Sequence, residues 1–285
     1  MKAVILGAGG QLGRALIATA PAGMMVAALD SAALDITDAE AVRVRITGAA
    51  PDLIVNAAAY TAVDRAETDE ARAQAVNGDA VATLTDVARA TGARLVQVST
   101  DFVFDGRSGT PYHPDARTGP LNAYGRTKLF GEQAAGDDAL IVRTAWVYAT
   151  QGGNFVRTML RLMAAQPLLR VVADQVGTPT YAPDLARTIW TLAGQGARGV
   201  HHATDSGIAS WYDFAVAIQE EALALGLLER VADVVPIATA DFPTPAVRPA
   251  FSVLDKSATW DACGGAGVHW RVNLRRMLKD VAAHG

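Results

Sequence analysis

The first apolar segment of the chain runs directly into glycines, and this arrangement limits the fold more than any other feature. Val4–Leu6 is predicted to be a short buried strand and Gln11–Ala20 a helix, with Gly7, Gly10 and Gly13 between and within them. Glycine at these places allows a tight turn, close approach of the backbone to a phosphate and close packing of the helix. The spacing therefore predicts that the free N–H groups of the helix start bind a dinucleotide pyrophosphate. A glycine turn without a ligand is the alternative.

Strands and helices alternate through the first half of the chain. Nearly all-apolar strands are predicted at Met25–Leu29, Asp52–Asn56, Arg94–Val98 and Leu140–Val142; helical segments include about Ala66–Ala90 and a helix within Pro120–Gly136. With short connections, this alternation predicts an α/β fold, a Rossmann-type doubly wound parallel sheet. Ligands of such sheets bind beyond the carboxyl ends of the strands. Four loops, including the segment Ser99–Asp101, therefore converge on one expected crevice.

The alternation of strands and helices becomes less regular after about Ala149. We expect residues 1–150 to form an NAD(P)-binding Rossmann domain and residues 151–285 a smaller C-terminal α/β substrate-binding domain, with parts of 168–205 returning to the first. In this half we predict helices at Asn154–Ala165, Ala182–Ala193, Ser210–Gly226 and Val272–Ala283, and strands at Leu169–Val172 and Gly199–His202. Prolines between Asp241 and Pro249 exclude a regular helix there.

Composition excludes several kinds of partner and site. The formal net charge of −4 and the absence of a Lys/Arg cluster argue against nucleic acid as a partner. No apolar stretch reaches the length of a membrane span, so no membrane partner is expected. The single cysteine, Cys263, excludes an internal disulfide and fits the reducing cytoplasm. The histidines show no metal-ligand spacing, and we expect no metal.

Tyr124 and Lys128 lie four residues apart, so their side chains share one face of the predicted helix. An ammonium group beside a phenol stabilises the phenolate, lowers the pKa of the tyrosine and makes it a better acid at neutral pH. Thr100, at the end of the preceding strand, can hold a carbonyl oxygen, while Lys128 can also bind the nicotinamide ribose. Together these residues predict reduction of a carbonyl by cofactor hydride and a tyrosine proton. The spacing of Tyr124 and Lys128 by itself also fits an alternative, in which the two residues lie on the half-exposed face of an amphipathic helix.

Asp30 ends the second predicted strand, where a carboxylate can accept hydrogen bonds from the adenosine ribose. A turn aspartate is the alternative interpretation. No Arg or Lys follows Asp30 closely to bind a 2′-phosphate, which favours NADH over NADPH. Asp35 and Ile36 lie just beyond and are expected to flank the adenine.

Further segments in both halves show a common pattern. They are Asp52–Asp64, Ser99–Gly106, Pro120–Glu132, Arg143–Tyr148, Asn154–Phe155, Asp174–Thr180, Trp211–Asp213 and Pro243–Pro249. In these segments the chain resembles the extended short-chain dehydrogenase/reductases and, within that group, the dTDP-4-dehydrorhamnose reductase family. The resemblance covers nearly the whole chain.

The resemblance implies a reaction and its cofactor. It implies that NADPH or NADH reduces the C4 ketone of dTDP-4-dehydro-6-deoxy-L-mannose to dTDP-L-rhamnose, the last step of dTDP-rhamnose synthesis. Two alternatives stay open. One is a reductase of the same type that acts on another dTDP-4-keto-6-deoxy sugar, and the other is a non-catalytic regulatory subunit with the same fold.

The resemblance also implies roles for individual residues. Tyr124 is the general acid, Lys128 its partner, and Thr100 the residue that bonds the carbonyl. The residues implied in cofactor binding, together with the glycines Gly7 and Gly13, are Gly10, Gln11, Leu12, Asp30, Asp35, Ile36, Ala59, Tyr60 and Thr61. Contact with the deoxysugar nucleotide is implied for Thr100, Asp101 and Trp146.

Two of the implied substrate contacts also have a purely structural interpretation. An indole at Trp146 suits the apolar face of a 6-deoxy sugar, although a tryptophan at a strand end is also a common core residue. The guanidinium fork of Arg248 matches the oxygens of a diphosphate, and a surface arginine is the alternative.

The chain departs from the family pattern at three positions. Phe102 stands where many members carry tyrosine, so a hydroxyl contact is lost there. Some members form dimers through magnesium held by glutamates, but the matching positions here are Ala15 and Pro183, which leaves Asp280 as the nearby carboxylate. Hard cations need several oxygen ligands. We therefore expect no magnesium at an interface, and a monomer or weak homodimer.

Removal of divalent cations is expected to change nothing. Because the matching glutamates are missing, EDTA should leave both the rate of ketone reduction and the molar mass in solution unchanged. Activity assays and light scattering before and after EDTA treatment measure the two quantities. A fall in either one would contradict the expectation.

Overall fold

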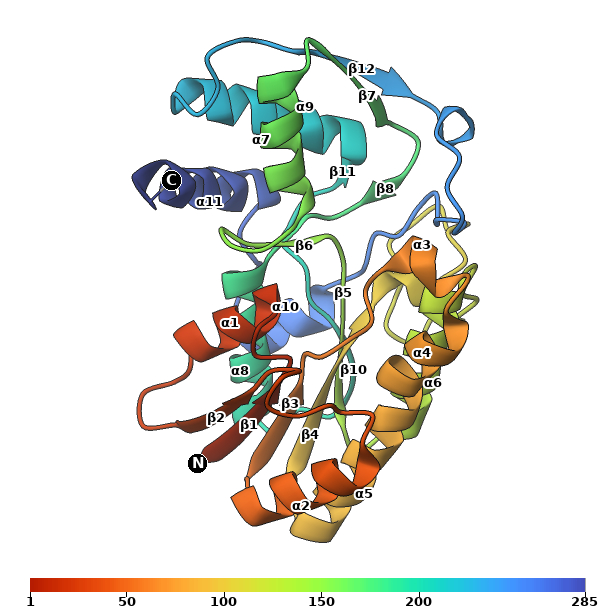
Figure 1. Cartoon of the computed structure of the whole chain (residues 1–285), viewed down its shortest axis with the longest axis vertical. Coiled ribbons are helices and arrows are strands. Elements are labelled where there is room, and N and C mark those ends of the chain that lie inside the picture. Colours follow the sequence, from red (N-terminus) through yellow and green to blue (C-terminus); the bar gives the residue numbers. More distant parts are fainter. Residues whose placement is uncertain (285) are drawn as a thin grey trace.

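A six-stranded parallel sheet forms the centre of the larger part of the molecule in the computed structural model, which describes residues 1–284 (Figure 1). The strand order is β10-β5-β4-β3-β1-β2. The strands are β1 Lys2–Leu6, β2 Met25–Leu29, β3 Leu53–Asn56, β4 Arg94–Thr100, β5 Leu140–Thr144 and β10 Gly199–His202. Every pairing in this sheet is parallel, which confirms the predicted Rossmann-type sheet. The chain turns to opposite sides of β1 to reach β2 and β3, so the ligand crevice is expected at that point.

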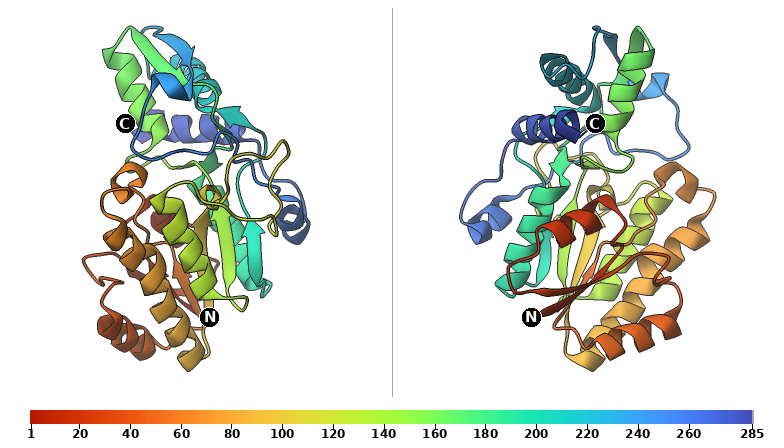
Figure 2. Two further views of the ribbon diagram at one scale, coloured as in Figure 1. Left: turned by 90° about the vertical axis from the view of Figure 1, so that its right-hand side faces the viewer. Right: turned by 60° about the vertical axis from the view of Figure 1, so that its left-hand side comes forward.

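Helices cover both faces of the sheet (Figures 1 and 2). One face packs against α1 Gln11–Ala18 and α8 Ala182–Gly194, and the other against α2 Ala39–Ala49, α5 Ala80–Thr91 and α6 Ala123–Ala135. Alternate residues of β1 serve the two faces, with Ile5 on the side of α1 and Leu6 on the side of α2. A strand buried on both faces must be apolar throughout, which explains the apolar run at the start of the sequence.

The long helical region expected at 66–90 is interrupted. It consists of α3 Val63–Ala66, α4 Glu70–Gln74, the π-helical turn η1 Ala75–Asp79 and α5. Inside the wide turn, the buried Asn77 accepts a hydrogen bond from Tyr60 N at 2.9 Å and donates to Tyr60 O at 3.1 Å. Its amide also donates to Thr127 Oγ1 on α6 at 3.1 Å. The interruption therefore ties the loop after β3 to the helix that carries Tyr124.

Helices and short strand pairs make up the smaller part of the molecule (Figure 2). The helices are α7 Phe155–Ala165, α9 Trp211–Ala224 and α11 Trp270–His284; the pairs are β7 Leu168–Val172 with β12 Asp233–Ile237, β6 Val147–Tyr148 with β9 Thr180–Tyr181, and β8 Val176–Gly177 with β11 Ala209–Ser210. The sequence did not indicate β12, nor α10 Ser257–Cys263. Strand β7 pairs with β12 outside the main sheet, whereas β10 pairs with β5 inside it. The domain division at residue 150 stays a prediction.

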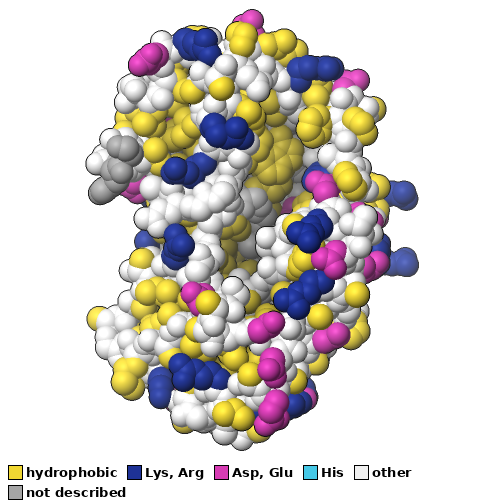
Figure 3. All heavy atoms as spheres, viewed as in Figure 1, with side chains coloured by type: hydrophobic (Ala, Val, Ile, Leu, Met, Phe, Trp, Pro, Cys, Tyr) yellow, Lys and Arg dark blue, Asp and Glu magenta, His cyan; other side chains and the backbone are white. Residues whose placement is uncertain are grey.

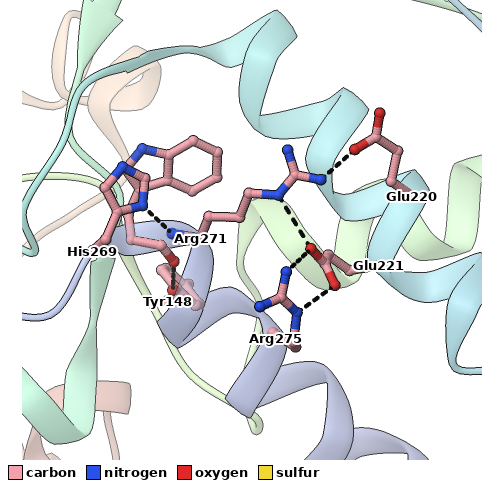
Figure 4. A network of polar contacts seen from close by, with 7 residues as sticks. Tyr148, Glu220, Glu221, His269, Arg271 and Arg275 are labelled. Atoms are coloured by element: carbon pink, nitrogen blue, oxygen red, sulfur yellow. Dashed lines mark hydrogen bonds and ion pairs between the residues drawn. The ribbon is translucent and has the colours of Figure 1, made fainter.

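Ion pairs join α9 to α11 (Figure 4). Arg275 donates to both carboxylate oxygens of Glu221, at 2.7 and 2.6 Å, and Arg271 donates to the same carboxylate at 3.1 Å and also to Glu220. The two guanidinium groups hold the pKa of Glu221 below its usual value. These contacts fix the direction of α9, which begins at Trp211.

None of the helices in the described residues combines the length and the apolar composition that crossing a membrane requires.

Candidate active site

A cavity of about 1040 Å³ lies at the carboxyl ends of the parallel strands. The space-filling view shows it as a hollow between the two parts of the molecule, with hydrophobic side chains on its upper wall (Figure 3). Its walls come from the glycine loop, the ends of β2 to β5, the start of α6, and residues of the smaller part such as Trp211 and Arg248. This volume is at the upper end for ligand sites and suits two ligands side by side.

The cavity brings together all but one of the residues predicted from the sequence. Its lining includes Gly7, Gly10, Gln11, Leu12, Asp30, Asp35, Ile36, Ala59, Tyr60, Thr61, Thr100, Asp101, Tyr124, Lys128, Trp146 and Arg248. The exception is Gly13, which is buried in α1. A Cβ atom at Gly13 would lie 2.1 Å from the carbonyl oxygen of Gly7, so this glycine permits α1 to pack against the loop and does not itself border the cavity.

The glycine loop presents the start of α1 to the cavity. Gly7 has a φ of 74°, and Gly10, the residue before the helix, has no side-chain cap within the described chain. The first N–H groups of α1 therefore lack a side-chain acceptor, which is the arrangement that binds phosphate.

Asp30 is a turn aspartate that also lines the cavity, and its contact with the adenosine ribose stays a prediction. Its Oδ1 accepts hydrogen bonds from Ala32 N and Ala33 N, at 3.1 and 2.9 Å, and its side chain borders the cavity. Nearby, Asp35 lies 3.7 Å from Arg72, and bonds from Thr37 hold the pKa of Asp35 below its usual value. This end of the cavity thus holds both carboxylates and a guanidinium.

Tyr124 sits in the first turn of α6, at the wall of the cavity. Asn122 caps this helix by accepting a hydrogen bond from Gly125 N at 2.8 Å. The ring of Phe102 lies 5.6 Å from that of Tyr124 and nearly perpendicular to it. Thr100 lies close enough to Tyr124 to lower the pKa of the phenol, and its hydroxyl donates to Asp101 Oδ1 at 3.0 Å. The two residues predicted to act on a carbonyl therefore lie together in the wall of the cavity.

The pKa of Tyr124 moves in the direction opposite to the one expected from Lys128. Loss of water around the phenol raises its pKa to about 12, and the charge of Asp101 adds to the increase, while the nearby Thr100 hydroxyl opposes it. Lys128 donates to the carbonyl oxygen of Val98 at 2.6 Å, and burial lowers its pKa to about 8 against the opposing charge of Glu132. The expectation of a lowered tyrosine pKa was wrong because it counted the ammonium and omitted desolvation. At neutral pH the phenol keeps its proton.

A buried ion pair holds α6 against the sheet. Arg143 on β5 donates to both carboxylate oxygens of Glu132, at 2.9 and 2.7 Å, and both side chains are 5% exposed. Ser99 on β4 donates to the same carboxylate at 2.5 Å. Glu132 lies one helical turn after Lys128, and Ser99 immediately precedes Thr100, so one carboxylate connects the elements that carry the three predicted catalytic residues.

Arg248 lies at the edge of the cavity and is already paired. Its guanidinium donates to both oxygens of Asp64, at 2.7 and 3.0 Å, and to Thr244 Oγ1 at 2.6 Å. The pair joins α3 to the proline-rich segment and holds the pKa of Asp64 below its usual value. Contact of Arg248 with a diphosphate stays a prediction, and it would require the guanidinium to leave or share Asp64.

Sequence reasoning missed several lining residues. They include Arg72, Thr144, Gly152, Gly153 and Trp211. Trp211 stacks on Trp146 with ring centroids 3.5 Å apart. A signal for Trp211 existed, because it lies in a segment that resembles the family. Arg72 gave none, because a charged residue on a polar helix is usually a solvated one.

Comparison with known proteins identifies close relatives over the full length. The model of a family described as the RmlD substrate binding domain matches residues 1–283. A dTDP-4-dehydrorhamnose reductase of Aggregatibacter actinomycetemcomitans is 40% identical over 294 residues, which cover 99% of each chain. A probable dTDP-4,6-dihydroxy-2-methyloxan-3-one 4-ketoreductase of Streptomyces antibioticus is 43% identical and covers 99% of this chain and 96% of the relative. The crystal structure of a dTDP-4-dehydrorhamnose reductase from Bacillus anthracis in complex with NADP has a TM-score of 0.92 at 33% identity, covering 98% of this chain and 99% of that one.

The buried Asp101 should make stability depend on pH. Burial raises its pKa from 3.8 to about 6, so the charged carboxylate lowers the free energy of unfolding. This loss of stability is absent below pH ~4 and fully present above pH ~6. Relative to the unsubstituted protein, Asp101→Asn should therefore gain about 1–2 kcal/mol of unfolding free energy between about pH 5 and pH 7.5. Urea unfolding at both pH values measures the difference.

Asp64→Asn is the matched control for this experiment. The pKa of Asp64 is lowered, so its stabilisation is complete above the unfolded-state pKa and is lost only at more acidic pH. Asp64→Asn should therefore lower the free energy of unfolding by the same amount at both pH values. If Asp101→Asn behaves in the same way, its carboxyl group does not titrate as the structure indicates.

Proposed function

The chain belongs to the dTDP-4-dehydrorhamnose reductase family, and we propose that its cleft performs the reaction of that family with Tyr124, Lys128 and Thr100 as the catalytic residues. The reaction is the NAD(P)H-dependent reduction of the C4 ketone of dTDP-4-dehydro-6-deoxy-L-mannose to dTDP-L-rhamnose, the last step of dTDP-rhamnose synthesis. The observation that carries the proposal is that Tyr124, Lys128 and Thr100 line one cavity together with the glycine loop.

The residues of the cavity fit a nicotinamide dinucleotide. The start of α1, without a side-chain cap, would hold the pyrophosphate, Asp30 the adenosine ribose, and Asp35 with Ile36 the adenine. Ala59, Tyr60 and Thr61 would line the path between the two ends. When bound, the cofactor supplies a hydride.

We propose that either NADPH or NADH serves. Asp30 favours the free ribose hydroxyls of NADH. Arg72 adds a cation to the same end of the cavity, where the 2′-phosphate of NADPH would find a partner. The relative from Bacillus anthracis binds NADP, which supports use of the phosphorylated form.

Tyr124 is the proposed proton donor. Because burial holds its pKa near 12, the phenol is protonated at neutral pH and can pass its proton to the C4 oxygen as negative charge develops there. Thr100, which lines the cavity beside Tyr124, would bond the same oxygen and fix its position. Lys128 would exchange the carbonyl of Val98 for the nicotinamide ribose. Its charge would then lie closer to the reacting oxygen and favour proton release.

The remaining predicted residues suit the sugar nucleotide. Trp146 and Arg248 line the cavity, and Asp101 lies beside Thr100. An arginine fork that already binds a carboxylate on two atoms has the geometry for a diphosphate.

One specific observation favours a second candidate. The Streptomyces antibioticus relative, at 43% identity, is named as a probable 4-ketoreductase of a different dTDP-sugar. A reductase acting on another dTDP-4-keto-6-deoxy sugar is therefore the alternative substrate assignment. The juxtaposed Tyr124, Lys128 and Thr100 disfavour a non-catalytic regulatory subunit.

The cytoplasm is the proposed location, since the single cysteine of the sequence, Cys263, is a free thiol. A monomer or weak homodimer is the proposed assembly.

Replacement of the proton donor tests the assignment. Tyr124→Phe should lower kcat by about two to four orders of magnitude, because the variant keeps the ring and loses the transferable proton. The oxidation of NADPH with dTDP-4-dehydrorhamnose measures the rate. Tyr212→Phe, outside the cavity lining, is the control and should retain the original rate. Equal rates for Tyr124→Phe and the unsubstituted enzyme would contradict the role of Tyr124.

A further inference from the structure

A buried hydroxyl group at the wall of the cavity has no hydrogen-bond partner within the described chain. Thr144 is the last residue of β5, and it lines the cavity although it is only 6% exposed. Its Oγ1 atom makes no hydrogen bond to any described residue. Burial of a hydroxyl group without a partner costs free energy, so such a group in a ligand site calls for an explanation. None of the roles implied by the family resemblance falls on Thr144.

Thr144 lies beside Thr100 at the edge of the sheet. The two residues are register partners in the parallel pair of β4 and β5, as are Val98 and Val142 before them. Register partners on neighbouring parallel strands direct their side chains to the same face of the sheet. The hydroxyl group of Thr144 therefore neighbours the one that is proposed to hold the C4 oxygen of the sugar.

Thr144 also faces the side of the sheet on which α1 lies. Because side chains alternate along a strand, Thr144 points to the same face as Val142. Val142 packs in one core cluster with Leu12 of α1. Arg143, between them, points to the other face, where it pairs with Glu132 of α6. The side of Thr144 is thus the side whose glycine loop and helix start are proposed to bind the dinucleotide.

The order of the strands places Thr144 at the end of the cavity farthest from Asp30. Asp30 follows β2, the glycine loop follows β1, and β4 and β5 lie beyond them in the sheet. Lys128, the proposed partner of the nicotinamide ribose, is bonded to β4. A dinucleotide that runs from Asp30 past Lys128 would bring its nicotinamide ring to the ends of β4 and β5. The lining just after Thr144 includes the apolar residues Ala145 and Val147, which suit a flat ring with one polar substituent.

We propose that Thr144 is a cofactor-binding residue whose hydroxyl group bonds the carboxamide of the nicotinamide ring. The inference rests on the proposed function and deepens it by naming the group that holds the ring. The carboxamide is attached to the carbon atom next to the one that releases the hydride, so a hydrogen bond there fixes the rotation of the ring relative to the ketone. A hydroxyl group can accept from the amide N–H or donate to the amide oxygen. Either bond removes the cost of the unpartnered hydroxyl group.

Two ligands separate the contact with the nicotinamide ring from the rest of the cofactor. NADPH carries the ring, whereas 2′-phospho-ADP-ribose ends at the ribose. In titration calorimetry, Thr144→Val should weaken the binding of NADPH by about three- to tenfold and leave that of 2′-phospho-ADP-ribose within about twofold of the unsubstituted protein. Thr144→Ser, which keeps the hydroxyl group, should bind NADPH within about twofold of the unsubstituted protein.

Thr259→Val is the matched control. Thr259 on α10 is also buried and its Oγ1 atom also has no partner in the described residues, but it does not line the cavity. Both substitutions replace an unpartnered hydroxyl group with a methyl group, so both should raise the midpoint of urea unfolding of the ligand-free protein. Only Thr144→Val should reduce the further increase that NADPH produces. A purely structural role of Thr144 would instead lower the midpoint in Thr144→Val.

Unchanged binding of NADPH by Thr144→Val would overturn the proposal, as would equal losses for NADPH and 2′-phospho-ADP-ribose. Weaker binding of dTDP-L-rhamnose with unchanged binding of NADPH would also overturn it, because the hydroxyl group would then serve the sugar. If Thr144→Val does not fold, Thr144→Ala and Thr144→Ser decide by the same comparison of ligands. Failure of the unsubstituted protein to bind NADPH would instead overturn the proposed function.

Discussion

The ion pair between Glu132 and Arg143 is the interaction on which the site depends. Two charged side chains that are 5% exposed are stable only as partners, and removal of one from such a pair typically costs about 3–5 kcal/mol. Here the pair holds α6 against β5, and the hydrogen bond from Ser99 to Glu132 joins β4 to them. The positions of Tyr124 and Lys128 relative to Thr100 are thus set inside the core, away from the ligands that the three residues would contact.

Desolvation decides the protonation states at this edge of the sheet. It raises the pKa of Tyr124 to about 12 and that of Asp101 to about 6, and it lowers the pKa of Lys128 to about 8. Each shift favours the neutral form, as a site poor in water requires. A protonated tyrosine and a lysine that can readily change partners are suited to proton donation. The ion pairs of Arg248 and Arg72 lie at more exposed positions, where charged ligand groups would enter.

The sequence was informative where one local rule settles the structure. Apolar strands buried on both faces predicted the parallel sheet, and because parallel strands end at one edge, residues as distant as Gly10, Asp30 and Tyr124 were correctly expected to lie together. Features that depend on long-range pairing were missed. The π-helical turn around Asn77, the β7–β12 pair and the Arg248–Asp64 bond each join segments whose proximity no local pattern indicates. The expected direction of the pKa shift of Tyr124 was wrong for the same reason, since burial is a property of the whole fold.

The proposed reaction delivers a hydride to C4 of a dTDP-linked sugar in this cleft. The most direct test uses NADPH with deuterium at its transferable position and follows the product of dTDP-4-dehydrorhamnose by NMR. We expect dTDP-L-rhamnose to form with deuterium on C4 of the sugar. Consumption of the ketone without deuterium at C4, or no consumption at all, would contradict it.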